Sequence, residues 1–227
     1  MTYCVSDIHN DYDNFEKLLS VVDFNPKEDC LYIVGDIFDR GMKPVELYEF
    51  IRMKDSIIPL LGNHDLWLAD FIRDYREGLR GDYFYNTFEI IKKQMGNSEI
   101  NELEGWIREM PLFKEIEVNG EKIMLSHAQT FEKPEEMSDR DILLGRNIDV
   151  SYLMDGISGY VSVIGHTGTD MIRKCVGEPM VAANEIWINP KGNLFAIDCG
   201  NGFRYYKNAI GMRLGIICLE TKEVYYV

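Results

Sequence analysis

The sequence predicts an α/β fold in which two mixed β-sheets pack face to face and are flanked by helices. The first half alternates short apolar runs with amphipathic stretches, which is typical of parallel β-α-β units with right-handed crossovers. The second half has strand-like runs separated by turns, which favours antiparallel pairing. Two packed sheets with helices outside would accommodate both halves. A length of 227 residues suits one domain spanning 1–227.

The first half is expected to contain three strands and two connecting helices. The amphipathic spacing of Phe15, Leu18 and Leu19 predicts a helix capped by Asp11 or Asp13. The expected strands are 3–5, 30–34 and 57–61, and the second helix is 44–53.

A mostly helical block is expected at about 66–111. Glycines 78, 81 and 96 would divide it into about three helices. Such a block beside a site at the strand ends would make a natural wall for a substrate.

Beyond this block the pattern changes to strands. Asn119-Gly120 between two apolar runs predicts a β-hairpin. The expected elements are strands 113–118, 122–125, 161–164, 194–197, 213–219 and 223–227, and a helix at 138–146.

The composition is that of a globular protein with an acidic surface. There are 38 acidic and 24 basic residues, giving a net charge of −14. This field would repel a nucleic-acid duplex, although metal ions could reverse the sign locally and allow a phosphate to bind.

The cysteine pattern and hydropathy indicate a cytoplasmic protein with no membrane partner. The cysteines number five, an odd count, and no Cys-x-x-Cys motif occurs, which favours buried free thiols in a reducing compartment. Met1 leads almost directly into a strand, so we expect no signal peptide. No apolar run approaches the roughly 18 residues that a membrane span needs.

Polar motifs follow three consecutive strands where each strand ends. They are Asp7-Ile8-His9, Gly35-Asp36-Ile37-Phe38-Asp39-Arg40-Gly41 and Gly62-Asn63-His64-Asp65. The carboxyl ends of strands in open α/β sheets are where ligands bind. Asp36 is therefore interpreted as a metal ligand, and Arg40 as a group that binds an anion.

All four histidines of the chain lie in such positions. Besides His9 and His64, they are His127 in Ser126-His127-Ala128 and His166 in Gly165-His166-Thr167. Histidines scattered over a surface would also fall in helices and charged loops, so the pattern favours one shared site.

The candidate metal ligands are Asp7, His9, Asp36, Asn63, His127 and His166. Carboxylate, imidazole and amide donors without a thiolate suit manganese first, with iron or zinc as alternatives. Six ligands are too many for one catalytic ion and suit two divalent ions bridged by Asp36. His64 is then free to act as a general acid oriented by Asp39, while Arg40 binds phosphoryl oxygens.

These motifs, in this order over residues 7 to about 200, resemble the calcineurin-like metallophosphoesterases, and in particular the phosphoprotein phosphatase branch with its bacterial and phage serine/threonine phosphatases. The resemblance implies a calcineurin-like four-layer sandwich. It implies a first metal on Asp7, His9 and Asp36, and a second on Asp36, Asn63, His127 and His166. It also implies His64 with Asp39 as the proton donor, and Arg40 and Asn63 as substrate-binding groups.

Two positions depart from the pattern of that branch. The branch commonly has Glu where this chain has Asp65, which is one methylene shorter. A second phosphate-binding arginine is also expected between the last two histidines, His127 and His166. Arg146 is the match, as a catalytic and substrate-binding residue, and Arg140 is the alternative.

Three functions are compatible with these motifs. The first is hydrolysis of phosphoserine or phosphothreonine in proteins by direct attack of a metal-bound hydroxide. The alternative is symmetrical hydrolysis of a dinucleoside polyphosphate such as diadenosine tetraphosphate. Its bases would stack on aromatic residues of the helical block, with Trp67, Tyr75, Tyr83 and Trp106 available. The third is a non-catalytic phosphate-binding or scaffold protein.

Overall fold

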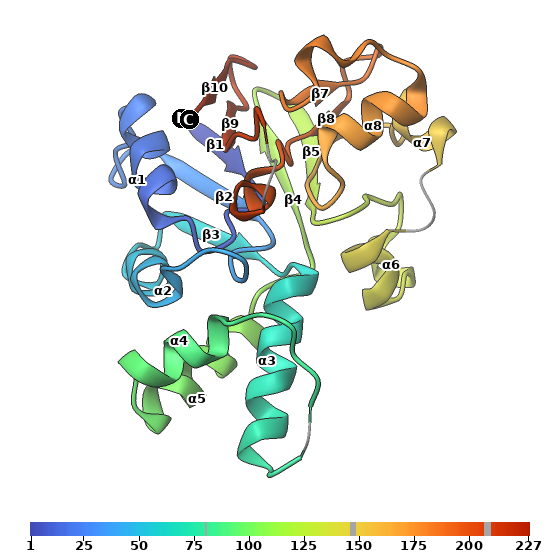
Figure 1. Ribbon diagram of the computed structural model, residues 1–227. Helices are drawn as coiled ribbons and strands as arrows, with labels where there is room; N and C mark the ends of the chain where they lie inside the picture. Colours follow the sequence, from blue (N-terminus) through green and yellow to red (C-terminus); the bar gives the residue numbers. More distant parts are fainter. Residues whose placement is uncertain (80, 146–148, 207–209) are drawn as a thin grey trace.

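The protein is described by a computed structural model, which covers residues 1–79, 81–145, 149–206 and 210–227. Two five-stranded sheets form its centre, in the strand orders β10-β9-β1-β2-β3 and β4-β5-β6-β8-β7. Helices lie on the outer side of each sheet (Figure 1). The predicted α/β class with two mixed, helix-flanked sheets is confirmed.

The first sheet joins the two ends of the chain. Strands β1 (Thr2–Val5), β2 (Cys30–Val34) and β3 (Ile57–Leu60) are parallel, as predicted. Strands β9 (Gly215–Cys218) and β10 (Val224–Tyr226) return antiparallel beside β1.

The second sheet corrects the prediction of an antiparallel second half. Strands β4 (Phe113–Val118) and β5 (Glu121–Ser126) form the predicted hairpin. However, β5, β6 (Val161–Ile164) and β8 (Leu194–Ala196) are parallel, and β7 (Trp187–Ile188) pairs antiparallel with β8.

The reason lies in the crossovers that parallel strands require. The connection from β5 to β6 contains α6 (Asp139–Leu144) and α7 (Val150–Asp155), and the next connection contains α8 (Thr169–Val176). The sequence analysis predicted the first of these three helices only.

The inner faces of the two sheets make a shared core. Cys4 and Val34 of the first sheet pack in one cluster with Leu125 and Val163 of the second. Alternate residues of the same strands, such as Val5, face the opposite way and pack with the helices of the first half. Those helices are α1 (Tyr12–Val21) and α2 (Pro44–Arg52).

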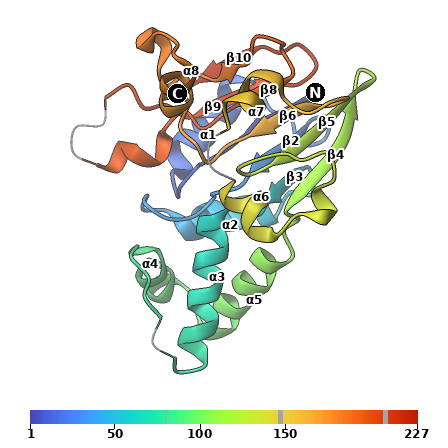
Figure 2. The ribbon, with the colours of Figure 1, turned by 90° about the vertical axis from the view of Figure 1, so that its right-hand side faces the viewer.

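The helical block consists of three helices, as predicted. They are α3 (Asn63–Arg76), α4 (Thr87–Gln94) and α5 (Asn97–Arg108). The block projects away from both sheets in two views at right angles (Figure 1, Figure 2). Because α3 begins at Asn63, the third polar motif lies on the first helical turn.

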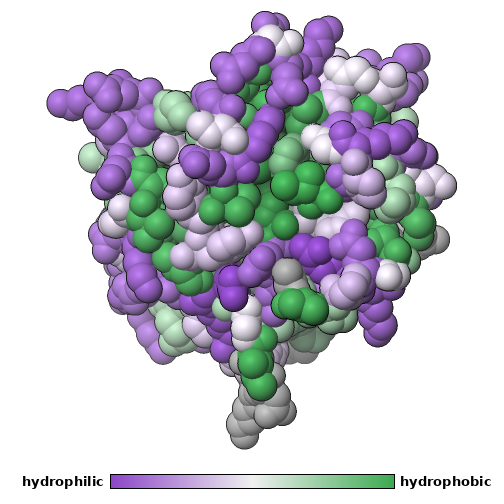
Figure 3. Space-filling view, turned by 90° about the horizontal axis from the view of Figure 1, so that it is seen from above, coloured by the Kyte–Doolittle hydropathy of each residue, from purple (hydrophilic) through white to green (hydrophobic). Residues whose placement is uncertain are grey.

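The structure agrees in part with the expected acidic surface and the expected buried free thiols. Hydrophilic side chains form much of the margin of the face seen from above (Figure 3). All five cysteines lie in the described residues and are free, and Cys175 is exposed whereas Cys4, Cys199 and Cys218 are buried. No helix in the described part of the chain is long and apolar enough to cross a bilayer.

Candidate active site

Five loops meet where strands of both sheets end. Asp7 and His9 follow β1, Asp36 follows β2, and Asn63 and His64 open α3 directly after β3. His127 follows β5 and His166 follows β6, so the second sheet contributes one histidine from each of two parallel strands. All seven side chains lie within one site, because each contacts at least one other member of the set.

Asp36 lies at the centre of this site. Its Oδ2 atom is 3.7 Å from Nε2 of His9 and 3.9 Å from Nε2 of His64. Its Oδ1 atom is 3.2 Å from Nε2 of His127. Among the described residues, two groups have ligand atoms within 4.8 Å of one another: His9 with Asp36 and His64, and Asp36 with His127 and His166. Asp36 is the residue that both groups share.

The inward-facing atoms of the site are hydrogen-bond acceptors. Nδ1 of His9 lies 2.8 Å from the carbonyl oxygen of Phe38, and Nδ1 of His127 lies 2.9 Å from the carbonyl oxygen of Val34. A carbonyl can only accept, so both rings donate from Nδ1 and present the lone pair of Nε2 to the site.

Asn63 adds another oxygen to the same space. Its Oδ1 atom lies 3.1 Å from Nε2 of His127 and 2.9 Å from Nδ1 of His166. The lone pair of Nε2 in neutral His127 faces this oxygen, and the two repel each other unless a positive charge lies between them. The donor set therefore fits cations, and nitrogen and oxygen donors without sulfur suit divalent metal ions.

The surroundings shift the pKa values of two histidines in opposite directions. Burial would lower the pKa of His127, but the charge and hydrogen bond of Asp36 raise it to about 10. Burial and the neighbouring His127 lower the pKa of His166 to about 4. The raised pKa of His127 reflects the negative charge of Asp36, which attracts positive charge to this part of the site.

Asp7 connects the loops after β1 and β6. Its Oδ1 atom is 3.8 Å from Nε2 of His9, while Oδ2 accepts hydrogen bonds from the Ser6 hydroxyl and from the His166 backbone N–H at 3.0 Å. Sequence reasoning missed Ser6, whose hydroxyl also donates to the Val34 carbonyl at 3.0 Å. Its position directly before Asp-x-His is the only signal that could have suggested a role.

Arg40 adds a positive charge to the site. Its Nη1 atom donates to Nε2 of His9 at 2.8 Å, and its Nη2 atom lies 3.1 Å from Nε2 of His64. Its buried Nε has no hydrogen-bond partner among the described residues, and its Cζ lies 4.9 Å from the ring centre of Phe203. A guanidinium with an unused donor can bind an anion.

His64 contacts Asp39, the residue that the sequence analysis expected to orient it. Nδ1 of His64 lies 2.8 Å from Oδ2 of Asp39, which is fully buried. This contact leaves Nε2 of His64 facing the site, 3.1 Å from Arg40.

Asp65 differs from the expected support for His64. Its carboxylate accepts from the backbone N–H groups of Gly62 at 2.9 Å, Asp36 at 3.0 Å, Ile37 at 2.9 Å and Phe38 at 3.1 Å. It therefore holds the loop after β2 onto the start of α3, and acts on Asp36 rather than on the ring of His64.

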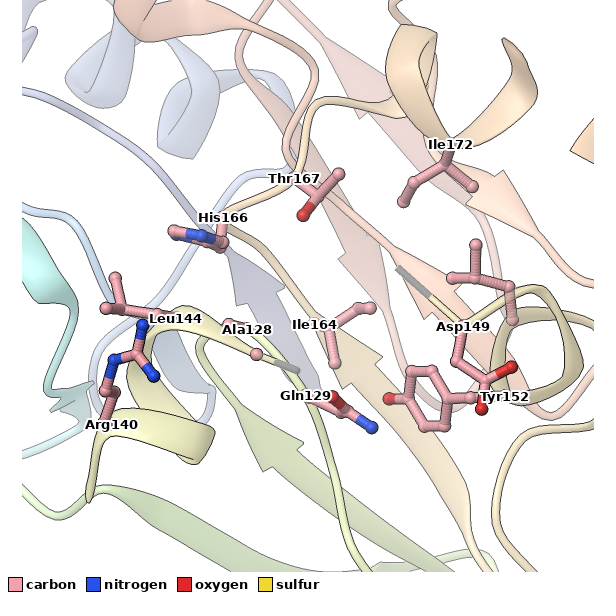
Figure 4. A pocket seen from close by; sticks show the side chains of 12 residues that line it. Ala128, Gln129, Arg140, Leu144, Asp149, Tyr152, Ile164, His166, Thr167 and Ile172 are labelled. Atoms are coloured by element: carbon pink, nitrogen blue, oxygen red, sulfur yellow. The ribbon is translucent and has the colours of Figure 1, made fainter. Parts of the chain in front are cut away.

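The predicted second arginine is not placed. Arg146 lies outside the described residues. Its alternative, Arg140, lines a cavity of about 420 Å³ together with His166. Asp149 and Tyr152 lie on the opposite side of this cavity (Figure 4).

The aromatic residues predicted to stack bases occupy different environments. The ring centre of Trp67, which is 43% exposed, lies 4.9 Å from that of His64. Trp106 instead packs on Tyr48 at 5.0 Å, and Tyr75 packs on Phe88 at 4.9 Å. Sequence reasoning missed Tyr85, at 5.0 Å from His64.

The chain is similar to proteins of one family in sequence. The family model described as calcineurin-like phosphoesterase matches residues 2–180. Symmetrical bis(5'-nucleosyl)-tetraphosphatases from Acidovorax sp. (strain JS42) and Haemophilus influenzae are each 36% identical to the chain, over 127 and 133 residues. Each match covers 56% of this chain but 43% of the relative, so the chain matches less than half the length of these relatives.

Solved structures show the same fold. A candidate diadenosine tetraphosphatase has a TM-score of 0.64 at 18% identity, covering 100% of this chain and 92% of that one. A protein serine/threonine phosphatase from Saccharomyces cerevisiae has a TM-score of 0.59 at 14% identity, covering 100% and 78%. At such identities the likeness concerns the fold alone.

Proposed function

The chain belongs to the calcineurin-like phosphoesterase family, and on this basis we propose that it is a phosphoric ester hydrolase with two divalent metal ions that cleaves dinucleoside polyphosphates symmetrically. The observation that carries the proposal is Asp36, which two ligand groups share. Bound there, divalent ions would lower the pKa of a water molecule and neutralise charge on the phosphoryl group.

The proposed ligands are those that the resemblance to the family implies. The first ion would be held by Asp7, His9 and Asp36, and the second by Asp36, Asn63, His127 and His166. His64 also lies near the first group, but we assign it as the proton donor because Asp39 holds its Nδ1 at 2.8 Å and its Nε2 faces the space beside Arg40 where the phosphate would bind. Manganese is the proposed metal, with iron or zinc as alternatives.

The other residues would act on the phosphate and the leaving group. Arg40 would bind phosphoryl oxygens through its guanidinium, whose Nε is unpaired in the described structure. His64 would give the proton on Nε2 to the leaving oxygen, while Asp39 holds the ring and its tautomer.

The dinucleotide is preferred to a phosphoprotein because of the curated relatives. The sequence analysis placed phosphoserine and phosphothreonine first, but the relatives at 36% identity are symmetrical tetraphosphatases. The similarity to the yeast phosphatase concerns the fold alone.

The surroundings of the site are also compatible with nucleosides. Trp67, Tyr85 and Phe203 border His64 and Arg40, and Trp67 and Phe203 are 43% and 45% exposed. Bases can stack on such rings. The cavity beside His166 offers a further recess for a large substrate.

A comparison of substrates tests this proposal. We expect kcat/KM for diadenosine tetraphosphate to exceed that for a phosphoserine peptide by at least about 10²-fold, with ADP as the sole nucleotide product. A Trp67→Ala variant should raise KM for the dinucleotide and leave p-nitrophenyl phosphate hydrolysis unchanged. The reason is that Trp67 would stack on a nucleobase, which p-nitrophenyl phosphate lacks. Faster hydrolysis of the peptide, or production of AMP with ATP, would overturn the substrate assignment.

A further inference from the structure

Tyr83 makes a contact to the His64–Asp39 pair that neither the motifs nor the family comparison assigns. Tyr83 lies between α3 and α4, in the helical block. Its hydroxyl donates to Oδ1 of Asp39, while Oδ2 of the same carboxylate accepts from Nδ1 of His64 at 2.8 Å. Asp39 is fully buried, and each of its two carboxylate oxygens accepts a hydrogen bond from one of these donors.

The ring of Tyr83 is itself held in place. It stacks on Phe71 of α3 with ring centres 4.8 Å apart and an angle of 20° between the planes. It also meets the edge of Tyr85 at 5.9 Å. Because Phe71 and His64 both belong to α3, one helix positions both groups that bind Asp39.

A second contact attaches the same segment to the site. Thr87, the first residue of α4, accepts a hydrogen bond from Nδ2 of Asn10 at 3.1 Å, and Asn10 directly follows His9. Thr87 is thus bonded to the loop after β1, and Tyr83 to the loop after β2.

We infer that Tyr83 is a positioning residue for the proton donor: its hydroxyl fixes the Asp39 carboxylate, which in turn fixes the ring of His64. The inference rests on the proposed function, in which His64 protonates the leaving oxygen.

The chemical step gives this role a defined consequence. The oxygen of water gives up one proton to solvent and forms a bond to phosphorus, the bond from phosphorus to the leaving oxygen breaks, and that oxygen takes the proton from Nε2 of His64. Solvent later returns a proton to His64. Without the hydroxyl, Oδ1 of a buried carboxylate loses its donor, so Asp39 can rotate and holds His64 less firmly. The loss grows with the basicity of the leaving oxygen, because only a basic leaving group needs the proton.

The test compares Tyr83→Phe with wild type on p-nitrophenyl phosphate and phenyl phosphate, which differ in leaving-group basicity. We expect kcat on phenyl phosphate to fall about 10-fold and kcat on p-nitrophenyl phosphate to fall less than about 3-fold, with KM unchanged. Tyr75→Phe is the matched control, because Tyr75 is a half-exposed tyrosine of α3 and packs on Phe88. It should leave both rates unchanged.

A His64→Asn variant separates the inference from the proposed function. It should show the same dependence on the leaving group, with a larger loss of about 10²–10⁴-fold on phenyl phosphate. If it does and Tyr83→Phe loses equally on both substrates or on neither, the inference fails and the proposed function stands. If His64→Asn has no such dependence, the assignment of the proton donor fails, and the inference fails with it.

A nuclear magnetic resonance measurement tests the inference without relying on activity, in case a variant is too unstable for reliable kinetics. In wild type, the Nδ1 proton of His64 should give a downfield resonance from its hydrogen bond to Asp39. It should move or broaden in Tyr83→Phe and stay unchanged in Tyr75→Phe. An unchanged resonance in Tyr83→Phe, in protein with native circular dichroism, would overturn the inference.

Discussion

At the scale of single residues, unusual backbone conformations bring the site together. Asp7, His9, Asp36 and His166 have φ values of 54°, 53°, 55° and 64°, and Arg40 has a φ value of 66°. Non-glycine residues rarely adopt this region, and such strain clusters at functional sites. The chain turns sharply directly after a strand and so directs these side chains back over the sheet edge.

Glycines allow other backbone segments to approach these side chains. A Cβ atom on Gly62 would lie 2.2 Å from the backbone nitrogen of Asp36, and one on Gly165 would lie 1.9 Å from the Ser6 hydroxyl oxygen. The sequence motifs contain these glycines, and only the coordinates show which contact each one permits.

Gly202 provides a prediction at this scale. A Cβ atom there would lie 2.2 Å from Cδ2 of His9 and 2.3 Å from Nη1 of Arg40. We expect Gly202→Ala to displace both side chains and lower kcat about 10²-fold, because small displacements in a site are costly. Steady-state kinetics on p-nitrophenyl phosphate measures this loss.

Gly105→Ala is the matched control. Gly105 is exposed on α5, and an added Cβ would have no neighbour within 4 Å. Alanine there should keep full activity and raise stability by about 1 kcal/mol. Equal rates for Gly202→Ala and wild type would mean that the loop of Gly202 does not constrain His9 and Arg40.

At the scale of elements, a charged cluster joins helices α3 and α5 of the helical block, in addition to their apolar contacts. Glu104 of α5 is 6% exposed and pairs with Arg76 of α3 and with Arg108, the latter at 2.8 Å. Burial alone would raise the pKa of Glu104, but hydrogen bonds from Arg108 and Arg76 lower it below its usual value.

A lowered pKa gives a stability difference with a defined pH dependence. We expect Glu104→Gln to lose about 1–2 kcal/mol at pH 7, since both arginines are partly exposed. The loss should be fully present above the ordinary pKa of 4.5 and should vanish as pH falls through the lowered pKa of the folded state. Urea unfolding at pH 7 and pH 4 measures it, with Glu102→Gln on the exposed side of α5 as control. A difference that widens toward low pH would contradict the pairing.

The elements also show where sequence reasoning succeeds and where it fails. Period-two and helical patterns located β1, β2, β3 and the three helices of the block. They failed for α7 and α8, and therefore for the pairing of β6 with its neighbours, since a crossover helix decides whether two strands can be parallel. Asp65 was recognised as part of a motif, but its backbone partners depend on tertiary contacts that no spacing reveals.

At the scale of the whole molecule, the two sheets together complete the site. Asp7, Asp36 and Asn63 follow strands of the first sheet, and His127 and His166 follow strands of the second. The order of motifs along the chain indicated one shared site, whereas the meeting of the two sheet edges became visible only in three dimensions. A net charge of −14 makes bound cations all the more important for a phosphate substrate.

The most direct test of the account is the metal content of the purified protein after equilibration with manganese and removal of free ions, measured by inductively coupled plasma mass spectrometry. We expect about two ions per chain in wild type and in His64→Asn, and at most one in Asp36→Asn, because Asp36 is the ligand that both ions share. Two ions in Asp36→Asn, or a single ion in wild type, would contradict a pair of metals bridged by Asp36.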